Sequence, residues 1–227
     1  MILQTPTPNI ENSLDFYKKL KFQTIKSNDD QFVTDGKAII KVNPDRYARA
    51  GILLYRSDWD KLIPEFQKLV PVFEIKDGHV MADSTGTWIY MLNGGMPFLE
   101  SGGDCFSSLG NYAGVSLETV SMSHSSSLWK LLGYKVTMGG PDEGWMVMGD
   151  EKGNSISFMH PNSCPHLFFN PSLTYFNGKN NPKVIQSIRD ADIPLAEEIT
   201  FFNKEGEVDN VIVRDPGGFG FFIFNDG

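Results

Sequence analysis

The segment His-Pro-Asn-Ser-Cys-Pro-His holds the densest group of side chains that could bind a metal ion: His160, Cys164 and His166. Imidazole nitrogen and thiolate sulfur are ligands that zinc prefers, and a fourth ligand from Cys105 or His124 would complete a tetrahedral set. The spacing matches no standard zinc motif, and a proline-rich loop can hold such residues without binding metal. The segment therefore leaves a metal site open as an alternative.

Gln4 and Glu118 are polar side chains that an expected strand would carry on its ligand-facing side, because strand residues alternate between two faces. Glu118, near the end of its strand, could accept a cation or act as a general base if burial raised its pKa. The simpler interpretation is a solvated or locally paired carboxylate, which is the usual state of glutamate.

Aromatic side chains supply the candidates for the wall of a ligand site, because aromatic faces stack on planar or cationic ligands. These candidates are Trp88, Tyr90, Trp145, Phe158, Tyr175 and Phe222. The alternative is that they pack between a sheet and its helices. The sequence contains no nucleophile elbow, phosphate-binding loop, dinucleotide fingerprint or His-Glu-x-x-His motif, so these families of enzyme are not indicated.

The elements that must position these residues repeat along the chain. An Asp-x-x-Gly turn followed by an apolar strand occurs at residues 83–86, 150–153 and 215–218. In the last copy Pro216 presets φ at the second turn position and Gly217 permits a positive φ at the third, which predicts a type II turn. Three copies indicate a repeated supersecondary unit.

Each repeat predicts the order β-α-β-β-β. In the first repeat Asn9 is the expected N-cap of a helix over residues 11–20, and in the second Asp58 is the expected N-cap. The stretches Phe-Tyr-Lys-Lys-Leu-Lys-Phe (16–22) and Leu-Trp-Lys-Leu-Leu-Gly-Tyr (128–134) align where the helices of two repeats end.

We predict an α+β protein with four βαβββ modules, curved mixed sheets and helices outside. Modules 1–48 and 49–100 form an N-terminal domain (1–100), and modules 112–162 and 163–227 form a C-terminal domain (112–227). The linker is expected at residues 101–111, where glycine and serine interrupt the periodicity.

This pattern resembles the vicinal oxygen chelate superfamily, which includes glyoxalase I, bleomycin-resistance proteins, fosfomycin-resistance proteins and extradiol dioxygenases. The resemblance rests on the opening stretch TPNIENSLDFYKKLKF (7–22) and the closing stretch VRDPGGFGFFIF (213–224). It implies that paired modules curl into a cup that holds a ligand. One such scaffold supports many chemistries, so the resemblance predicts the fold better than the function.

The resemblance also implies metal ligands, usually His and Glu with occasional Gln, near the start of the first strand and in the last strand of each module. The corresponding positions fall near Ile2, Gly51, Gly114 and Pro171 in first strands, and near Lys41, Tyr90, Ser157 and Phe222 in last strands. None is His, Glu or Asp, and a shift of one residue recovers none. We therefore expect no cofactor and no family-type metal site, with a divalent metal as the alternative.

The composition of the chain limits which partners the protein can bind. The net charge of −8 argues against nucleic acid and anionic membranes, which require a basic surface. The N-terminal sequence has no signal-peptide pattern, so we expect a cytoplasmic protein. Two cysteines are too few for a disulfide framework, and both are expected to be free.

We expect a monomer, because four modules can mimic within one chain the dimer of two-module relatives; a homodimer is the alternative.

Three functions fit these observations. The first is metal-independent binding of a small organic molecule in an aromatic cup, similar in mode to bleomycin-resistance proteins, with sequestration as its mechanism. The second is a glyoxalase-like lyase or dioxygenase whose metal uses non-standard ligands. The third is a non-catalytic interaction module whose own aromatic side chains fill the cup.

Overall fold

The computed structural model describes residues 1–27, 30–97 and 103–227. Each of the four modules contributes one α-helix: α1 (Ile10–Lys19), α2 (Ile63–Phe66), α3 (Met122–Leu131) and α4 (Asn181–Asp190). The first two modules contribute β1 (Ile2–Pro6), β2 (Gln23–Ser27), β3 (Asp30–Thr34), β4 (Ile39–Asn43), β5 (Gly51–Arg56), β6 (Val72–Ile75), β7 (Gly78–Ala82) and β8 (Trp88–Asn93). The last two contribute β9 (Tyr112–Glu118), β10 (Lys135–Gly140), β11 (Trp145–Gly149), β12 (Ser155–Met159), β13 (Ser172–Phe176), β14 (Leu195–Ile199), β15 (Asn210–Arg214) and β16 (Gly220–Phe224).

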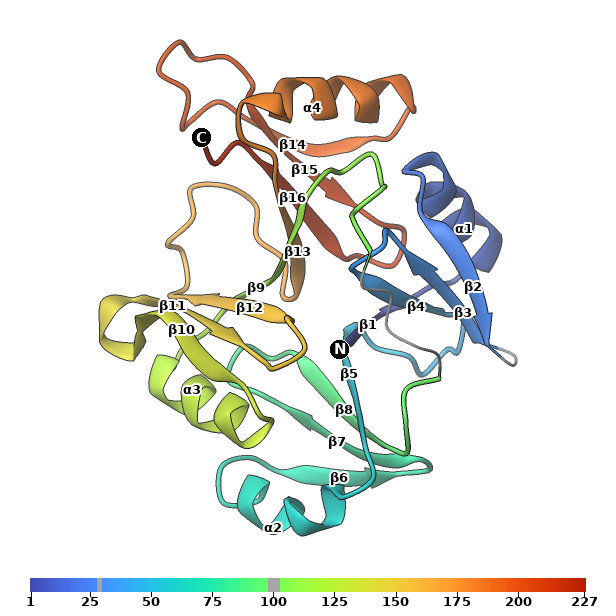
Figure 1. The fold of residues 1–227 in the computed structure, drawn as a ribbon, viewed down its shortest axis with the longest axis vertical. Helices are drawn as coiled ribbons and strands as arrows, with labels where there is room; N and C mark the ends of the chain where they lie inside the picture. The colour runs from blue at the N-terminus through green and yellow to red at the C-terminus, as the bar shows by residue number, and fades with distance from the viewer. Residues whose placement is uncertain (28–29, 98–102) are drawn as a thin grey trace.

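Within the described residues these strands form two eight-stranded mixed sheets (Figure 1). The first sheet has the order β2-β3-β4-β1-β5-β8-β7-β6, and the second has the order β10-β11-β12-β9-β13-β16-β15-β14. At the centre of each sheet the first strands of two consecutive modules pair antiparallel, β1 with β5 and β9 with β13. Consecutive modules therefore share a sheet, and the predicted α+β fold of paired βαβββ modules is confirmed.

The first and third modules share local hydrogen bonds as well as their order of elements. Asn9 caps α1 as predicted, because its side chain accepts a hydrogen bond from the backbone of Asn12 at 3.1 Å. The hydroxyls of Thr7 and Ser13 lie 2.7 Å apart, and those of Thr119 and Ser125 lie 2.8 Å apart at the same place in the third module.

Two local predictions need correction. Asp58 does not cap its helix: its carboxylate accepts from Arg56 at 2.9 Å, and a 3₁₀ turn over Trp59–Lys61 precedes the short α2. The positive φ of the last turn falls on Gly218, at 103°, and not on Gly217. Gly217 is required for a different reason, since a Cβ atom there would lie 2.1 Å from the carbonyl oxygen of Pro6.

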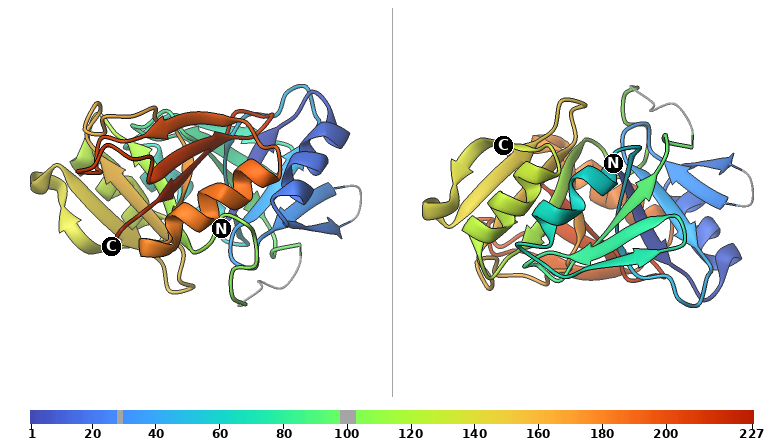
Figure 2. Two further views of the ribbon diagram at one scale, coloured as in Figure 1. Left: turned by 90° about the horizontal axis from the view of Figure 1, so that it is seen from above. Right: turned by 90° about the horizontal axis from the view of Figure 1, so that it is seen from below.

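The main hydrophobic core lies between the two sheets and includes side chains from all four helices. Helix α2 comes from a module of the first sheet and helix α3 from a module of the second. These two helices contact each other on one side of the molecule, whereas α4 lies on the opposite side (Figures 1 and 2). Smaller apolar clusters occupy the other face of each sheet. Each sheet therefore has one face in the common core and one face turned away from it.

Two equivalent aromatic residues reach across the core to a buried turn aspartate of the other sheet. The hydroxyl of Tyr17 in α1 donates to Asp215 Oδ2 at 2.8 Å, and the indole N–H of Trp129 in α3 donates to Asp83 Oδ2 at 3.0 Å. We call these contacts the two clasps. Thr5 in β1 strengthens the first by donating to the same oxygen of Asp215 at 2.7 Å.

The connection between the sheets was predicted at residues 101–111. Residues 101 and 102, like the predicted domain end at residue 100, lie outside the described residues. The rest of the connection packs against the first module: the backbone of Phe106 donates to Asp35 O at 2.8 Å, and Leu109 is fully buried. Cys105 and Cys164 are both free, as expected.

None of the helices in the described part of the chain is long and apolar enough to cross a membrane.

Candidate functional site

Strand alternation gives each sheet a face outside the common core. On the first sheet this face carries Gln4, Lys41 and Tyr90, and we call it the first cup. On the second sheet it carries Ser116 and Phe222, among others, and we call it the second cup. The neighbours of these residues along each strand point into the core between the sheets.

The floor of the second cup is a row of hydroxyl groups. Ser157 in β12 pairs with Ser116 in β9, and Thr174 in β13 pairs with Phe222 in β16. The hydroxyls of Ser116 and Thr174 are buried and lie 2.7 Å apart. Each of these hydroxyls can donate one hydrogen bond and accept others, so the row can bind polar substituents of a ligand.

Aromatic rings form the wall of the second cup. The rings of Phe222 and Phe224 are stacked with centroids 5.6 Å apart, and His166 approaches each of them edge-on at 5.2 Å. Phe168 completes the group, edge-on to Phe222 at 5.0 Å. These rings and the hydroxyl row line an open cavity of about 120 Å³, to which Cys164 and Phe176 also contribute.

The loop between β12 and β13 delivers His166 and Phe168 to this cavity. Glu118 anchors the loop by accepting from the backbone of Asn162 at 3.0 Å, and its own backbone N–H donates to Asn170 at 2.8 Å. Glu197 accepts from the backbone of Leu167 at 2.6 Å. The carboxylate of Glu118 is therefore locally paired, in agreement with the simpler of its two interpretations.

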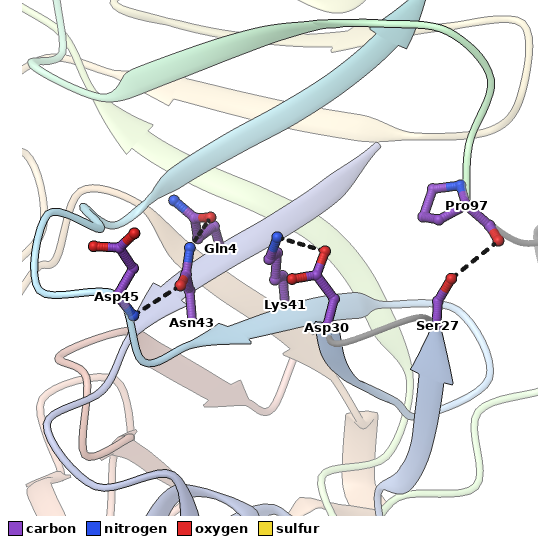
Figure 3. Close-up of polar contacts among 7 residues, drawn as sticks. All are labelled: Gln4, Ser27, Asp30, Lys41, Asn43, Asp45 and Pro97. Atoms are coloured by element: carbon purple, nitrogen blue, oxygen red, sulfur yellow. Dashed lines mark hydrogen bonds and ion pairs between the residues drawn. The ribbon is translucent and has the colours of Figure 1, made fainter. Parts of the chain in front are cut away.

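The first cup has a polar floor (Figure 3). Gln4 is 5% exposed, and its side-chain N–H donates to the carbonyl of Arg49 at 3.0 Å. Its side-chain oxygen accepts from Asn43 at 2.9 Å, and Asn43 in turn accepts from the backbone of Asp45 at 3.0 Å. This chain of amides connects β1 and β4 to the loop that follows β4, and it fixes the orientation of both amide groups.

Further along the same face, Lys41 is turned toward Asp30, with its ammonium 2.7 Å from the carboxylate (Figure 3). Burial raises the pKa of Tyr90, and hydrogen bonds from Gln4 and the backbone of Arg49 partly oppose this rise. Tyr90 therefore stays a neutral phenol at physiological pH. A cavity of about 410 Å³ opens above Gln4, Asn43 and Tyr90.

Four of the six predicted wall aromatics lie on the cup faces. Tyr90 and Phe222 line cavities, whereas Trp88 and Trp145 stand at strand ends and are 38% and 43% exposed.

Phe158 and Tyr175 are corrected to core residues. Phe158 is 1% exposed and packs edge-on against Trp129, and the buried hydroxyl of Tyr175 donates to Asp35 Oδ2 at 2.6 Å. Each is one position out of phase with a cup residue of its strand, which turns it to the opposite face.

Several lining residues were not predicted. The alternation that places Phe222 in the cup also places Phe224 there, two residues later, and the same alternation could have found Ser116 and Thr174. Asn43 lies two residues after Lys41 in β4, so the same alternation could have placed it in the first cup. The position of Phe168 had no comparable signal, because it lies in an irregular loop.

The possible metal ligands are not brought together. Cys164 and His166 line the second cavity, whereas His160 is exposed and lies beside Gly144. Among the residues that the structure describes, no group of three or more His, Cys, Asp or Glu side chains is placed to hold a metal ion.

The strand register also refines the positions expected of family metal ligands. The last-strand residues Lys41, Tyr90, Ser157 and Phe222 lie beside Gln4, Leu53, Ser116 and Thr174 of the first strands. Apart from the amide of Gln4, these hydroxyl, ammonium and hydrocarbon groups do not match the ligands that the resemblance implies, which are His and Glu with occasional Gln.

Comparison with known proteins supports the fold. A scan of protein-family models finds none that matches the chain, and a search of curated proteins finds no relative. Among solved structures, a catechol 2,3-dioxygenase is similar with a TM-score of 0.58 and 12% identity, covering 97% of this chain and 85% of that one. An extradiol ring-cleaving dioxygenase from B. fuscum has a TM-score of 0.58 and 14% identity, with 99% and 71% covered.

A variant of homoprotocatechuate 2,3-dioxygenase from B. fuscum is similar to the same degree, with a TM-score of 0.60, 12% identity, and 99% and 70% of the two chains covered. These extradiol dioxygenases are members of the vicinal oxygen chelate superfamily. The chain therefore has the fold of that superfamily, in its two-domain form with four βαβββ modules.

Proposed function

We propose that the protein binds a small single-ring aromatic compound in the second cup and does so without a metal ion. The observation that carries the proposal is the cavity of about 120 Å³ bounded by Phe168, Phe222, Phe224 and His166. An enclosed apolar cavity of about 150 Å³ binds benzene, so this somewhat smaller cavity, which is open to solvent on one side, can hold one ring only if part of the ligand stays at its mouth. Edge-to-face contacts with several rings would stabilise an aromatic ligand beyond its simple burial.

The hydroxyl row gives the proposed ligand its second feature. Ser116, Ser157 and Thr174 lie on the floor of the cavity and can hydrogen-bond to hydroxyl substituents on the ring. Such a site would favour a phenol or catechol over an unsubstituted ring, because burying the hydroxyl row against hydrocarbon would leave polar groups unpaired. The structural neighbours include a catechol dioxygenase and a homoprotocatechuate dioxygenase, which supports a ligand of this class.

Metal independence is supported by the side chains at the positions that the fold family uses for ligands. In the second cup these positions hold Ser116, Ser157, Thr174 and Phe222. Three neutral hydroxyls and a phenyl ring supply no soft or anionic donor for a transition metal. The proposed role is sequestration, as in the bleomycin-resistance mode. We extend the proposal to a cytoplasmic monomer with no nucleic-acid partner.

The structural neighbours favour one second candidate, a ring-cleaving dioxygenase that holds its metal outside the usual positions. Metal analysis of the purified protein separates the two candidates. A stoichiometric transition metal, whose removal by a chelator abolishes turnover of catechol, would favour the dioxygenase. Under the leading proposal, catechol binds the chelator-treated protein with unchanged affinity and is recovered intact.

Calorimetric titration with catechol tests the binding site itself. We expect Phe222→Ala to weaken binding about tenfold, because a contact between two aromatic rings contributes about 0.5–1.5 kcal/mol beyond the burial of their area. The matched control is Phe73→Ala in the first sheet, since Phe73 is 61% exposed and outside both cavities. Equal affinity in the two variants would contradict binding in the second cup.

A further inference from the structure

The first cup is chemically different from the second and is more than three times as large in cavity volume, about 410 Å³ against about 120 Å³. We propose that it is a second, independent binding site, whose ligand is a planar organic cation of two-ring size, such as an aryl amidine. Cavities of about 300–1,000 Å³ are typical of sites for small organic ligands.

The floor of this cavity is preorganised. Gln4 is held by bonds to Arg49 O and Asn43, so neither amide needs to reorient when a ligand arrives. The N–H₂ group of Gln4 is used by Arg49 O and Tyr90, so the capacity left for a ligand edge is one N–H of Asn43 and one lone pair on each of the two amide oxygens. A planar group with N–H donors and a neighbouring ring fits such a floor better than a flexible chain, because less entropy is lost on binding.

Apolar and aromatic side chains provide the sides of the cavity. Ile75 and Leu92 line it beside the polar floor, and Tyr90 contributes a phenol that burial keeps neutral. Tyr47, which is 78% exposed, stands at the mouth on the loop after β4. Tyrosine faces attract cations through the quadrupole of the ring, so the two tyrosines favour a cationic planar ligand.

The rim of the cavity carries charged side chains of both signs. Asp45 lies on the loop after β4, and Asp77 lies on the turn between β6 and β7, so carboxylates enter the cavity lining from two different segments. Lys76 is the cationic side chain in that lining, and the guanidinium of Arg49, bonded to the lining residue Ala48 at 2.9 Å, also acts on Tyr90. Lys41 is paired with Asp30 and is not part of the lining, so the two carboxylates and the faces of the two tyrosines are what favour a cation.

The test compares 2-naphthamidine with 2-naphthoate, which share a two-ring skeleton and carry opposite charges. Calorimetric titration of the full chain at low ionic strength is expected to give at least about tenfold tighter binding of the amidine, a difference of about 1.4 kcal/mol. Two fused rings exceed the single-ring space of the second cup. Saturation with catechol is therefore expected to leave amidine binding unchanged.

The matched variants are Asp77→Asn and Glu74→Gln. Both remove one carboxylate from exposed positions of neighbouring segments, but only Asp77 lines the cavity. We expect Asp77→Asn to weaken amidine binding about three- to tenfold, whereas Glu74→Gln leaves it within about twofold, since an exposed charge acts over short distances. The side-chain amide resonances of Gln4 and Asn43 should shift on titration.

Three results would overturn the proposal: equal or tighter binding of the naphthoate, equal effects of the two variants, or unperturbed Gln4 and Asn43 resonances at saturating amidine. Because catechol binding in the second cup is measured separately, failure of this site would leave the proposed function untouched, and the reverse also holds.

Discussion

Tyr17 and Trp129 occupy the same place in the two halves of the molecule, and each reaches the buried turn aspartate of the opposite sheet. On the faces turned away from the core, the two halves carry different side chains at equivalent positions. Gln4 in the first sheet corresponds to Ser116 in the second, and Tyr90 corresponds to Phe222, since each lies next to its equivalent neighbour in the strand register. One cup has an amide floor and the other has a hydroxyl floor with an aromatic wall.

The contrast follows from what each face must do. The clasps join the two sheets in one core. Removing either partner of a clasp therefore leaves a buried polar group without its hydrogen bond. The cup faces contribute little to that core, and their side chains are free to define ligand chemistry. The first cup presents carboxylates and fixed amides, whereas the second presents rings. In this chain the clasps therefore serve the fold, whereas the cups are open to different functions.

The largest effect is expected at the first clasp. Asp215→Ala removes the acceptor of Thr5 and Tyr17, and also that of the backbone N–H of Phe219, which donates at 2.6 Å. We expect a loss of about 3–5 kcal/mol in the free energy of unfolding, because buried donors are left unpaired. Urea denaturation followed by tryptophan fluorescence measures it.

The control is the equivalent turn of the third module. Among the described residues, the bonds that Asp150 accepts come from its own turn, including the backbones of Lys152 at 2.9 Å and Asn154 at 2.8 Å, and Asp150 is partly exposed. Asp150→Ala is expected to cost about 1 kcal/mol. Similar losses for Asp150→Ala and Asp215→Ala would mean that the cross-sheet bonds add nothing to the turn itself.

A smaller effect tests whether the two clasps are energetically equivalent. Tyr17→Phe removes one donor to Asp215 while keeping the ring, and we expect a loss of about 1–2 kcal/mol. Trp129→Phe removes the donor to Asp83 but also shortens the side chain, so its loss should exceed that of Tyr17→Phe by about 1–2 kcal/mol of packing. Losses that add in the double variant would show that the two clasps act independently.

The pH dependence of stability gives a third test. Burial raises the folded-state pKa of Asp215 and of Asp83, despite the opposing hydrogen bonds from Thr5 and Thr85 respectively. A raised carboxyl pKa contributes stability that is full below the unfolded pKa of about 3.9 and is lost as pH rises through the folded pKa. The wild type should therefore lose stability relative to Asp215→Asn as pH increases from about 4 toward neutrality. A constant difference across this range would show that Asp215 titrates alike in both states.

Much of this architecture could be predicted from the sequence, because it depends on local signals. The Asp-x-x-Gly turns, the cap at Asn9 and the alignment of residues 16–22 with 128–134 all report backbone geometry, which repeats. That alignment already paired Tyr17 with Trp129. Their aspartate partners lie 198 and 46 residues away in sequence, and no local pattern identifies them.

The cup residues were harder to predict, for a related reason. Alternation separates the two faces of a strand but does not say which face is the core. Phe158 and Tyr175 were therefore grouped with Phe222, although they lie on the other face. Phe168 and His166 lie on an irregular loop, where alternation has no meaning, and only the tertiary structure brings them beside Phe222.

The smallest predicted effect addresses the hydroxyl row that distinguishes the second cup. Thr174→Val keeps the shape of the side chain and removes the hydroxyl that lies 2.7 Å from Ser116. We expect catechol affinity to fall about three- to tenfold, because one hydrogen bond contributes about 1 kcal/mol. Leu53→Val at the equivalent position of the first cup changes volume without polarity and should leave catechol affinity unchanged. If Thr174→Val binds catechol as tightly as the wild type, the hydroxyl row only pairs within itself, and the ligand of the second cup is recognised by its ring alone.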